Sequence, residues 1–113
     1  MRTLTIYLIG PIAMLFAISA FADAPDGAKL FASNCSSCHG SKGQGTTGLA
    51  PALKGDAFVI SGKLEDLEAT IQNGRSGDQK HFKDFPVAMP AWHLSPDDLR
   101  AVVDYLRGGL QKP

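Results

Sequence analysis

Apolar residues recur at helical spacing in three parts of the chain, whereas no run of strand length alternates between apolar and polar residues. The first part starts at Asp26, a suitable N-cap, and predicts a helix that continues to about Asn34. A second helix is predicted over residues 63–73, where leucine and isoleucine side chains share one face and Gly74 follows as a terminator. The pattern therefore predicts an all-α fold.

The third predicted helix has the clearest start signals in the sequence. Ser95 is its N-cap, Pro96 occupies the first helical position, and two aspartates follow in the first turn, where the helix dipole favours negative charge. The buried stripe of this helix is expected from Leu99, Val102, Val103 and Leu106. The chain thus has about three main helices, joined by long loops.

Residues 1–22 have the pattern of an export signal. Arg2 precedes an uncharged apolar run that ends in Ala20-Phe21-Ala22, a small-x-small pattern that signal peptidase accepts. About 18 apolar residues could also nearly span a bilayer, so a retained membrane anchor is the alternative. We expect cleavage after residue 22, which leaves residues 23–113 as a single exported domain.

Composition excludes several classes of function. Eleven basic and eleven acidic residues give a formal net charge of zero, which argues against a nucleic-acid binder held by phosphate contacts. Two cysteines are too few for a multi-disulfide scaffold or a four-thiolate zinc site. Beyond residue 22, Leu, Ile, Val and Phe make up only about 21% of the chain, so the domain needs an added core component.

Two irregular segments are longer than a compact domain ordinarily carries. Residues 40–48 contain four of the twelve glycines, and residues 76–87 lack helical periodicity. Segments of this kind are either flexible surface loops or stretches of chain that enclose a ligand, and the second interpretation gains from the motif described next.

Cys35-Ser36-Ser37-Cys38-His39 carries the strongest chemical signal in the sequence. The C-x-x-C-H pattern is typical of covalent haem attachment, because one helical turn places both thiols and the imidazole on one face. Both cysteines would form thioethers to a single haem, and His39 would be the proximal iron ligand. A thioredoxin-like motif, a zinc site and a plain disulfide are the alternatives; these would need strands, further ligands or a role for His39, respectively.

Met89 is the only methionine after residue 22 and is the expected distal ligand of the iron. A thioether is a soft ligand, and His/Met ligation raises the reduction potential of a haem. The alternatives are a core-filling role for this methionine, or distal ligation by His81 or His93.

A haem would also fill the thin core. Burial of a few hundred Å² of apolar surface contributes on the order of 10 kcal/mol, which is comparable with the whole stability of a domain. We therefore expect the apoprotein to be unfolded or molten. The apolar contacts of the haem are expected from Leu53, Phe58, Leu64, Leu67, Ile71, Phe82, Phe85, Val87 and Leu94.

With these motifs, residues 26–108 resemble a class I cytochrome c of the small bacterial exported kind. Gly27 and Phe31 are similar to the Gly-x-x-x-Phe pair of the family's N-terminal helix, and Val102 and Tyr105 to the last-helix residues that pack against that pair. The resemblance implies the cytochrome c fold, in which helices and long loops wrap around one covalent haem c.

The resemblance also implies further residues of the haem pocket. Pro51 matches the family proline whose neighbouring carbonyl accepts the free N–H of the proximal imidazole and so orients the ring. Leu53 matches a haem-packing position, and Trp92 belongs to a segment after Met89 that resembles the distal ligand loop. The polar segment 75–86 and the lack of a dense lysine patch depart from the commonest short forms.

An iron ligated by both His39 and Met89 would have no open site for a substrate. This implies one-electron transfer and not enzymatic turnover. We expect a monomeric carrier in the periplasm whose redox partners are a donor dehydrogenase or reductase and an acceptor oxidase, with no nucleic-acid partner. A haem c subunit of a periplasmic dehydrogenase or oxidase complex is the first alternative, and a ligand-binding haem protein with a labile Met89 is the second. Membrane contact is expected only if residues 1–22 are retained as an anchor.

Overall fold

The structure is a computed structural model that describes residues 24–113, so the predicted export signal at residues 1–22 lies outside the described residues. Between residues 24 and 113, β-type pairing is confined to two isolated bridges, of Thr46 with Ala50 and of Arg75 with Met89. The all-α prediction is confirmed. The elements are α1 (Gly27–Asn34), α2 (Ser36–His39), α3 (Ala57–Ser61), α4 (Leu64–Asn73), the 3-10 helix η1 (Gly77–Gln79), α5 (Pro96–Arg107) and the 3-10 helix η2 (Gly109–Gln111).

The three helices predicted from the sequence begin at or next to their predicted first residues. Asp26 accepts hydrogen bonds from two amides in the first turn of α1, at 3.0 and 3.2 Å. Ser95 accepts one from the amide of Asp98 at 3.2 Å, which caps α5 as predicted. α4 begins at Leu64, one residue later than predicted, and the Lys63 side chain makes no capping hydrogen bond.

The structure adds α3, which the hydrophobic pattern does not predict. Asp56 caps this helix by accepting a hydrogen bond from the Val59 amide at 3.0 Å. Val59 is buried in the core, whereas Ile60 is 43% exposed. A helix of five residues spans little more than one turn, which is too short for a period of 3.6 residues to be recognised.

α1 and α5 cross closely because Gly27 has no side chain at their contact. A Cβ on Gly27 would collide with the carbonyl of Ala101 and would lie 2.8 Å from the Cβ of Tyr105. One turn further on, the Phe31 and Tyr105 rings pack with their centroids 5.5 Å apart, and both Phe31 and Val102 are buried. The predicted packing of the Gly27/Phe31 pair against the last helix is confirmed.

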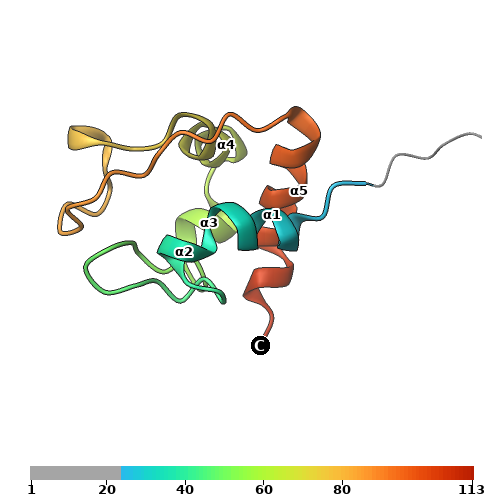
Figure 1. Ribbon diagram of the computed structural model, residues 1–113, viewed down its shortest axis with the longest axis horizontal. Coiled ribbons are helices and arrows are strands. Elements are labelled where there is room, and N and C mark those ends of the chain that lie inside the picture. Colours follow the sequence, from blue (N-terminus) through green and yellow to red (C-terminus); the bar gives the residue numbers. More distant parts are fainter. Residues whose placement is uncertain (1–23) are drawn as a thin grey trace, which may run out of the picture.

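The core lies along α5, and the opposite side of the molecule consists of loops. Arg107 ties α5 to α3 by donating hydrogen bonds to the carbonyls of Val59 and Gly62, at 3.1 and 2.6 Å. The chain after α2 and the chain between α4 and α5 both extend away from this helix (Figure 1). Leu99, predicted in the buried stripe, packs on the core but stays partly exposed. The buried cluster consists of Phe31, Val59, Leu67, Ile71, Val102, Val103, Leu106 and Leu110.

The longest helix of the described residues is α5, with 12 residues. Among residues 24–113, no helix is both long and apolar enough to cross a bilayer. An apolar pocket lies between the core and the two extended loops, and the predicted site residues line it.

Candidate functional site

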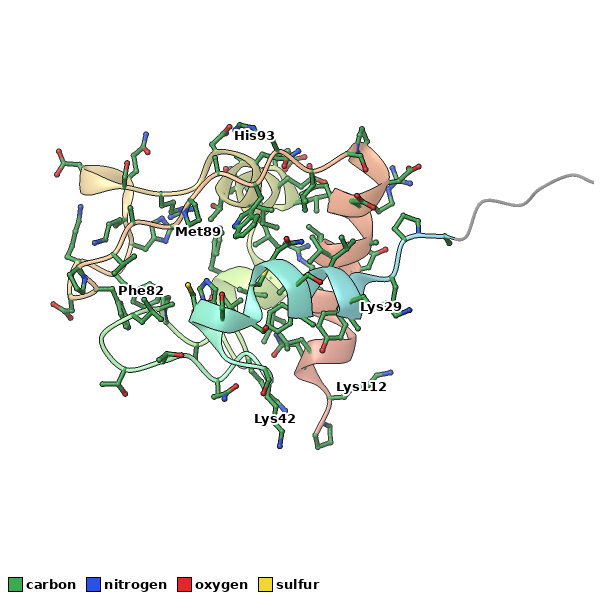
Figure 2. The ribbon with its side chains drawn as sticks, viewed as in Figure 1. Lys29, Lys42, Phe82, Met89, His93 and Lys112 are labelled. Atoms are coloured by element: carbon green, nitrogen blue, oxygen red, sulfur yellow. The ribbon has the colours of Figure 1, made fainter. Side chains whose placement is uncertain are left out.

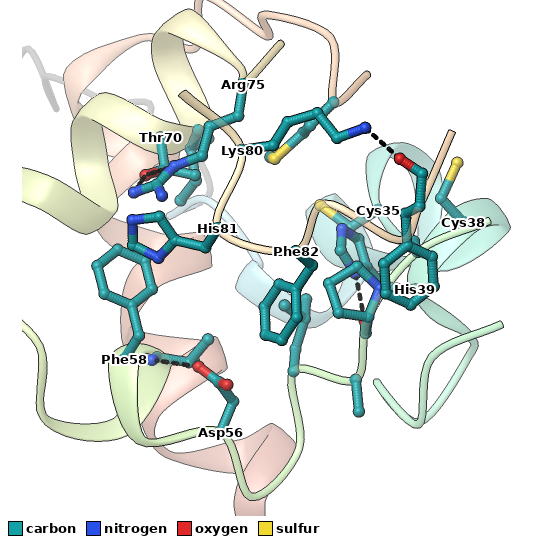
Figure 3. A pocket seen from close by; sticks show the side chains of 18 of the residues that line it. Cys35, Cys38, His39, Asp56, Phe58, Thr70, Arg75, Lys80, His81 and Phe82 are labelled. Carbon is teal, nitrogen blue, oxygen red and sulfur yellow. Dashed lines mark hydrogen bonds between the residues drawn. The ribbon is translucent and has the colours of Figure 1, made fainter. Parts of the chain in front are cut away.

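One pocket gathers the site residues that the sequence indicates. Its walls come from α2, the segment 49–53, α3, α4 and the chain from residue 80 to residue 92. Figure 3 shows the C-x-x-C-H turn on one side of this pocket, and Phe58 with His81 on the other. The predicted site residues that line it are Cys35, Cys38, His39, Pro51, Leu53, Met89 and Trp92.

The C-x-x-C-H residues form a helical turn that follows α1 directly. Cys35 ends α1, and its carbonyl accepts hydrogen bonds from the amides of Cys38 and His39 at 3.3 and 2.9 Å. Both cysteines are half-buried, and neither forms a disulfide. Burial, together with the neighbouring Cys38, raises the pKa of the Cys35 thiol to about 11. In the polypeptide before any attachment, this thiol is therefore protonated at neutral pH.

His39 is oriented by a hydrogen bond on one edge of its ring. The residue is buried, and its Nδ1 lies 2.8 Å from the carbonyl oxygen of Pro51. Because a carbonyl can only accept, Nδ1 is the donor of this hydrogen bond, and in the neutral ring the lone pair then lies on Nε2, where it can bind a metal. The hydrogen bond expected near Pro51 is made by the proline's own carbonyl.

Met89 reaches the same pocket from the chain between α4 and α5. Its backbone makes two hydrogen bonds with Arg75, at 2.9 and 3.0 Å, which hold it beside the end of α4. Gly74, with φ of 68°, permits this close approach, because a Cβ there would collide with the Met89 carbonyl. The Trp92 amide then donates to the Ile71 carbonyl at 3.1 Å, which fixes the far end of the loop to α4.

The two histidines that compete with Met89 in the sequence occupy different places. His81 lines the pocket, where its ring packs edge-on against Phe58 with centroids 5.5 Å apart. His93 does not line the pocket, and Figure 2 shows it at the outer edge of the molecule, away from Met89. Of the two, His81 alone is placed near enough to the pocket to compete with Met89.

Apolar side chains supply most of the remaining wall. Phe82 and Val87 are 48% and 49% exposed, yet both line the pocket, so their apolar surface is available to a ligand. The predicted apolar contacts that line the pocket are Leu53, Phe58, Leu67, Ile71, Phe82, Phe85 and Val87.

Leu64 and Leu94 were wrongly predicted to be pocket residues. Leu64 is the first residue of α4, where the helix end reaches solvent, and it is 43% exposed. Leu94 packs on the core. The Gln72 side chain accepts from the Leu94 amide at 2.7 Å and donates to its carbonyl at 2.8 Å, which holds this residue against α4 and outside the pocket.

The polar residues of the pocket wall that the sequence reasoning missed include Thr70, Arg75 and Lys80. The guanidinium carbon of Arg75 lies 5.1 Å from the centroid of the Phe58 ring. The Lys80 ammonium donates to the carbonyl of Phe85. No motif marks these residues: Thr70 lies on α4, and the positions of Arg75 and Lys80 depend on the path of the chain between α4 and α5.

The donor set of this pocket fits a covalently bound haem. Two thiols and an imidazole with a free Nε2 belong to one turn, and a thioether and apolar side chains complete the walls. Within the described chain, no group of three or more His, Cys, Asp or Glu side chains could hold a metal ion. A structural zinc site takes four protein ligands, whereas an iron in a macrocycle needs only two.

Comparison with known sequences identifies the family. The sequence model described as "Cytochrome C oxidase, cbb3-type, subunit III" matches residues 22–106. Cytochrome c55X from Stutzerimonas stutzeri is 36% identical over 110 residues, which cover 95% of this chain and 85% of that protein. The cbb3-type cytochrome c oxidase subunit FixP of Azorhizobium caulinodans is 35% identical over 86 residues, which cover 74% of this chain and 26% of that protein. The chain thus spans about a quarter of the length of this relative.

Solved structures support the same assignment. The c-type cytochrome NirC superposes with a TM-score of 0.53 at 32% identity, covering 76% of this chain and 91% of that one. The KustC0563 c-type cytochrome has the same fold, with a TM-score of 0.53 at 22% identity, covering 77% of this chain and 99% of that one. The predicted cytochrome c fold and covalent haem c are confirmed. The chain belongs to the family described as "Cytochrome C oxidase, cbb3-type, subunit III" and is a small class I c-type cytochrome.

Proposed function

We propose that this protein carries single electrons between redox partners by means of one haem c, which is bound to Cys35 and Cys38 and ligated by His39 and Met89. The observation that carries the proposal is the meeting of these four residues in one apolar pocket. The hydrogen bond from His39 Nδ1 to the Pro51 carbonyl adds to it, because this bond leaves Nε2 as the nitrogen that can bind the iron.

Two protein ligands would leave no open position on the iron. When bound, haem c supplies an iron that changes between Fe(III) and Fe(II). His39 is held by Pro51, and Met89 by its backbone pairing with Arg75, so the protein holds both ligands in place as the charge changes. The thioether of Met89 favours Fe(II) and raises the reduction potential.

The pocket walls favour electron transfer over substrate turnover. Leu53 and Trp92 line the pocket, where their apolar side chains would help to exclude water from a bound haem. A dry environment with two fixed ligands keeps rearrangement small between the two oxidation states. We therefore favour a carrier over an enzyme that binds substrate at the iron.

A haem c subunit of a larger redox enzyme is the second candidate. It is supported by the description of the matched family and by FixP, named as a subunit of a cbb3-type cytochrome c oxidase. The free carrier is favoured by two small relatives matched over most of their length: cytochrome c55X over 85% and cytochrome c6 of Leptolyngbya boryana, 35% identical, over 98%. Stoichiometric co-purification of a dehydrogenase or oxidase subunit would decide for the enzyme complex.

We also propose that residues 1–22 direct export to the periplasm and are removed, leaving one domain over residues 23–113. The partners there would be a donor dehydrogenase or reductase and an acceptor oxidase, met by a monomer. The mass of the protein from the periplasmic fraction tests this proposal: it should correspond to a chain that starts at Asp23 and carries one haem. Recovery of the uncleaved chain in the membrane fraction would support the anchor instead.

Optical and magnetic spectra of the purified protein in both oxidation states test the ligation. Met89→Ala should lose the low-spin character of the ferric protein, and Met89→His should keep it with a lower reduction potential. His81→Ala is the matched control, because His81 lines the same pocket, and its spectra should match those of the wild type. Loss of the low-spin spectrum in His81→Ala but not in Met89→Ala would assign the bond to His81. Immediate carbon monoxide uptake by the reduced wild type would favour a ligand-binding protein.

A further inference from the structure

The chain between α4 and the proposed distal ligand forms a long loop, residues 76–88, which we call the distal segment. It projects away from α5 as the yellow-to-orange loop in Figure 1. The segment is held internally, since the Lys80 ammonium donates to the Phe85 carbonyl. Its two ends meet at the backbone bridge between Arg75 and Met89. Any opening of this bridge therefore moves the residue that would bind the iron.

The bridge by itself is a weak closure for a loop of this length. The Arg75 amide donates to the Met89 carbonyl at 3.0 Å, and the Met89 amide donates to the Arg75 carbonyl at 2.9 Å. No strand ladder continues from this isolated pair within the described residues. Because closing a loop costs conformational entropy, any further attachment at the base of the segment adds to these two hydrogen bonds and to the one between the Trp92 amide and the Ile71 carbonyl.

The Arg75 side chain supplies such an attachment to α4. Its Nε and Nη2 both donate to the Thr70 hydroxyl oxygen, at 3.0 and 2.7 Å. The hydroxyl in turn donates to the Asp66 carbonyl at 2.7 Å, so its lone pairs face the guanidinium. The guanidinium carbon also lies 5.1 Å from the centroid of the Phe58 ring (Figure 3). Arg75, Thr70 and Phe58 are all half-buried, and a hydrogen bond to a charged donor is stronger there than on an open surface.

We propose that Arg75 is a positioning residue for the distal ligand: its guanidinium, held by Thr70, fixes the backbone pair that keeps Met89 at the pocket. The inference rests on the proposed ligation of the iron by Met89. Release of the guanidinium loosens the base of the distal segment, so Met89 leaves the pocket for a larger fraction of the time. A ligand that needs the distal position then binds more tightly, in proportion to that fraction.

Carbon monoxide binding to the reduced holoprotein measures this open fraction. Thr70→Val removes the shared acceptor but preserves the shape of the side chain and the charge of Arg75. We expect the carbon monoxide affinity to rise about tenfold, the effect of losing a hydrogen bond to a charged group. Arg75→Lys keeps the charge but loses the two-donor contact, and it should raise the affinity by a similar factor.

Arg107→Lys is the matched control. Arg107 also makes two hydrogen bonds, to the carbonyls of Val59 and Gly62, but it does not line the pocket. This variant should lower the stability of the protein and leave its carbon monoxide affinity unchanged. A rise in affinity as large as that of Thr70→Val would show that general loosening explains the effect, and would overturn the positioning role.

The same assay separates failure of this inference from failure of the proposed function. Carbon monoxide affinity that stays at the wild-type value in Thr70→Val, while Met89→Ala raises it strongly, overturns the positioning role and leaves Met89 as the ligand. A rise in Arg75→Lys without one in Thr70→Val also overturns it, because the effect then does not pass through the Thr70 contact. An unchanged affinity in Met89→Ala refutes the ligation itself.

Discussion

One added methyl group at the crossing of α1 and α5 should destabilise the protein. In Gly27→Ala, the new Cβ would collide with the Ala101 carbonyl and come within 2.8 Å of the Tyr105 Cβ. Both obstacles are rigid parts of α5, so the helices have to separate to admit it. The Phe31 ring, which is 1% exposed and packs 5.5 Å from the Tyr105 ring, centroid to centroid, would lose contact as they part.

The size of the effect follows from two opposing contributions. Overpacking of a tight contact costs about 1–3 kcal/mol in the free energy of unfolding. An alanine also restricts the unfolded chain, which returns about 0.4–1 kcal/mol. With about 2 kcal/mol for the first contribution and about 0.7 kcal/mol for the second, the net loss is about 1.3 kcal/mol. For a domain of roughly 60–100 residues, this corresponds to a fall in Tm of about 5–10 °C.

Guanidinium chloride unfolding of the holoprotein, followed by both circular dichroism and haem absorption, measures this loss. Ala28→Val is the matched control, because Ala28 is the exposed neighbour on α1, and it should change the free energy of unfolding by less than about 0.5 kcal/mol. An unchanged unfolding midpoint in Gly27→Ala, or an equal loss in Ala28→Val, would refute the reasoning from the helix crossing.

Three further predictions concern the core, the haem and the charge. Phe31→Ala should lower the free energy of unfolding by about 3–5 kcal/mol, and Ile60→Ala, at a side chain 43% exposed, by far less; denaturant titration of both variants checks the contrast. The haem-free Cys35→Ala/Cys38→Ala variant should melt without a cooperative transition, so a sharp calorimetric peak would contradict a core filled by haem. Electron-transfer rates measured by stopped flow should depend weakly on ionic strength, because residues 23–113 carry a formal net charge of only −1; a fall by orders of magnitude at modest salt would count against this.

Helix starts were predictable because capping is local chemistry. Asp26 and Ser95 each meet the amides that their sequence positions imply, so α1 and α5 begin as predicted. The short α3 was not predictable in this way, since its five residues are too few to show a helical period. Its place against α5 depends instead on a distant side chain, Arg107, whose partners are 45 and 48 residues away in sequence.

The candidate site was predictable where its residues form a sequence motif or where only one residue of the required type occurs after residue 22. The turn from Cys35 to His39 follows from spacing alone, and Met89 from being the only methionine after residue 22. Periodicity was less reliable for the wall, because it gives the face of a helix and not how far each residue lies from the pocket. Leu64 shares the face of Leu67 but lies at the exposed end of α4.

The hydrogen bonds that link Met89 to Arg75 and Thr70 could not be predicted from the sequence. Thr70 and Arg75 carry no motif, and they meet because α4 ends at Asn73 and Gly74 then redirects the chain. The backbone pairing of Arg75 with Met89 joins residues that are 14 apart in a segment without periodicity. Contacts of this kind depend on the tertiary path of a loop, which local propensities do not specify.

Covalent attachment of haem at Cys35 and Cys38 is tested most directly by mass spectrometry of the protein made in a host that matures c-type cytochromes. The intact mass should exceed that of the processed polypeptide by one haem, and the proteolytic peptide that contains both cysteines should carry the added mass. Neither thiol should then react with an alkylating reagent. A product with the mass of the bare polypeptide and two alkylated cysteines would contradict the haem site and the electron-transfer function that depends on it.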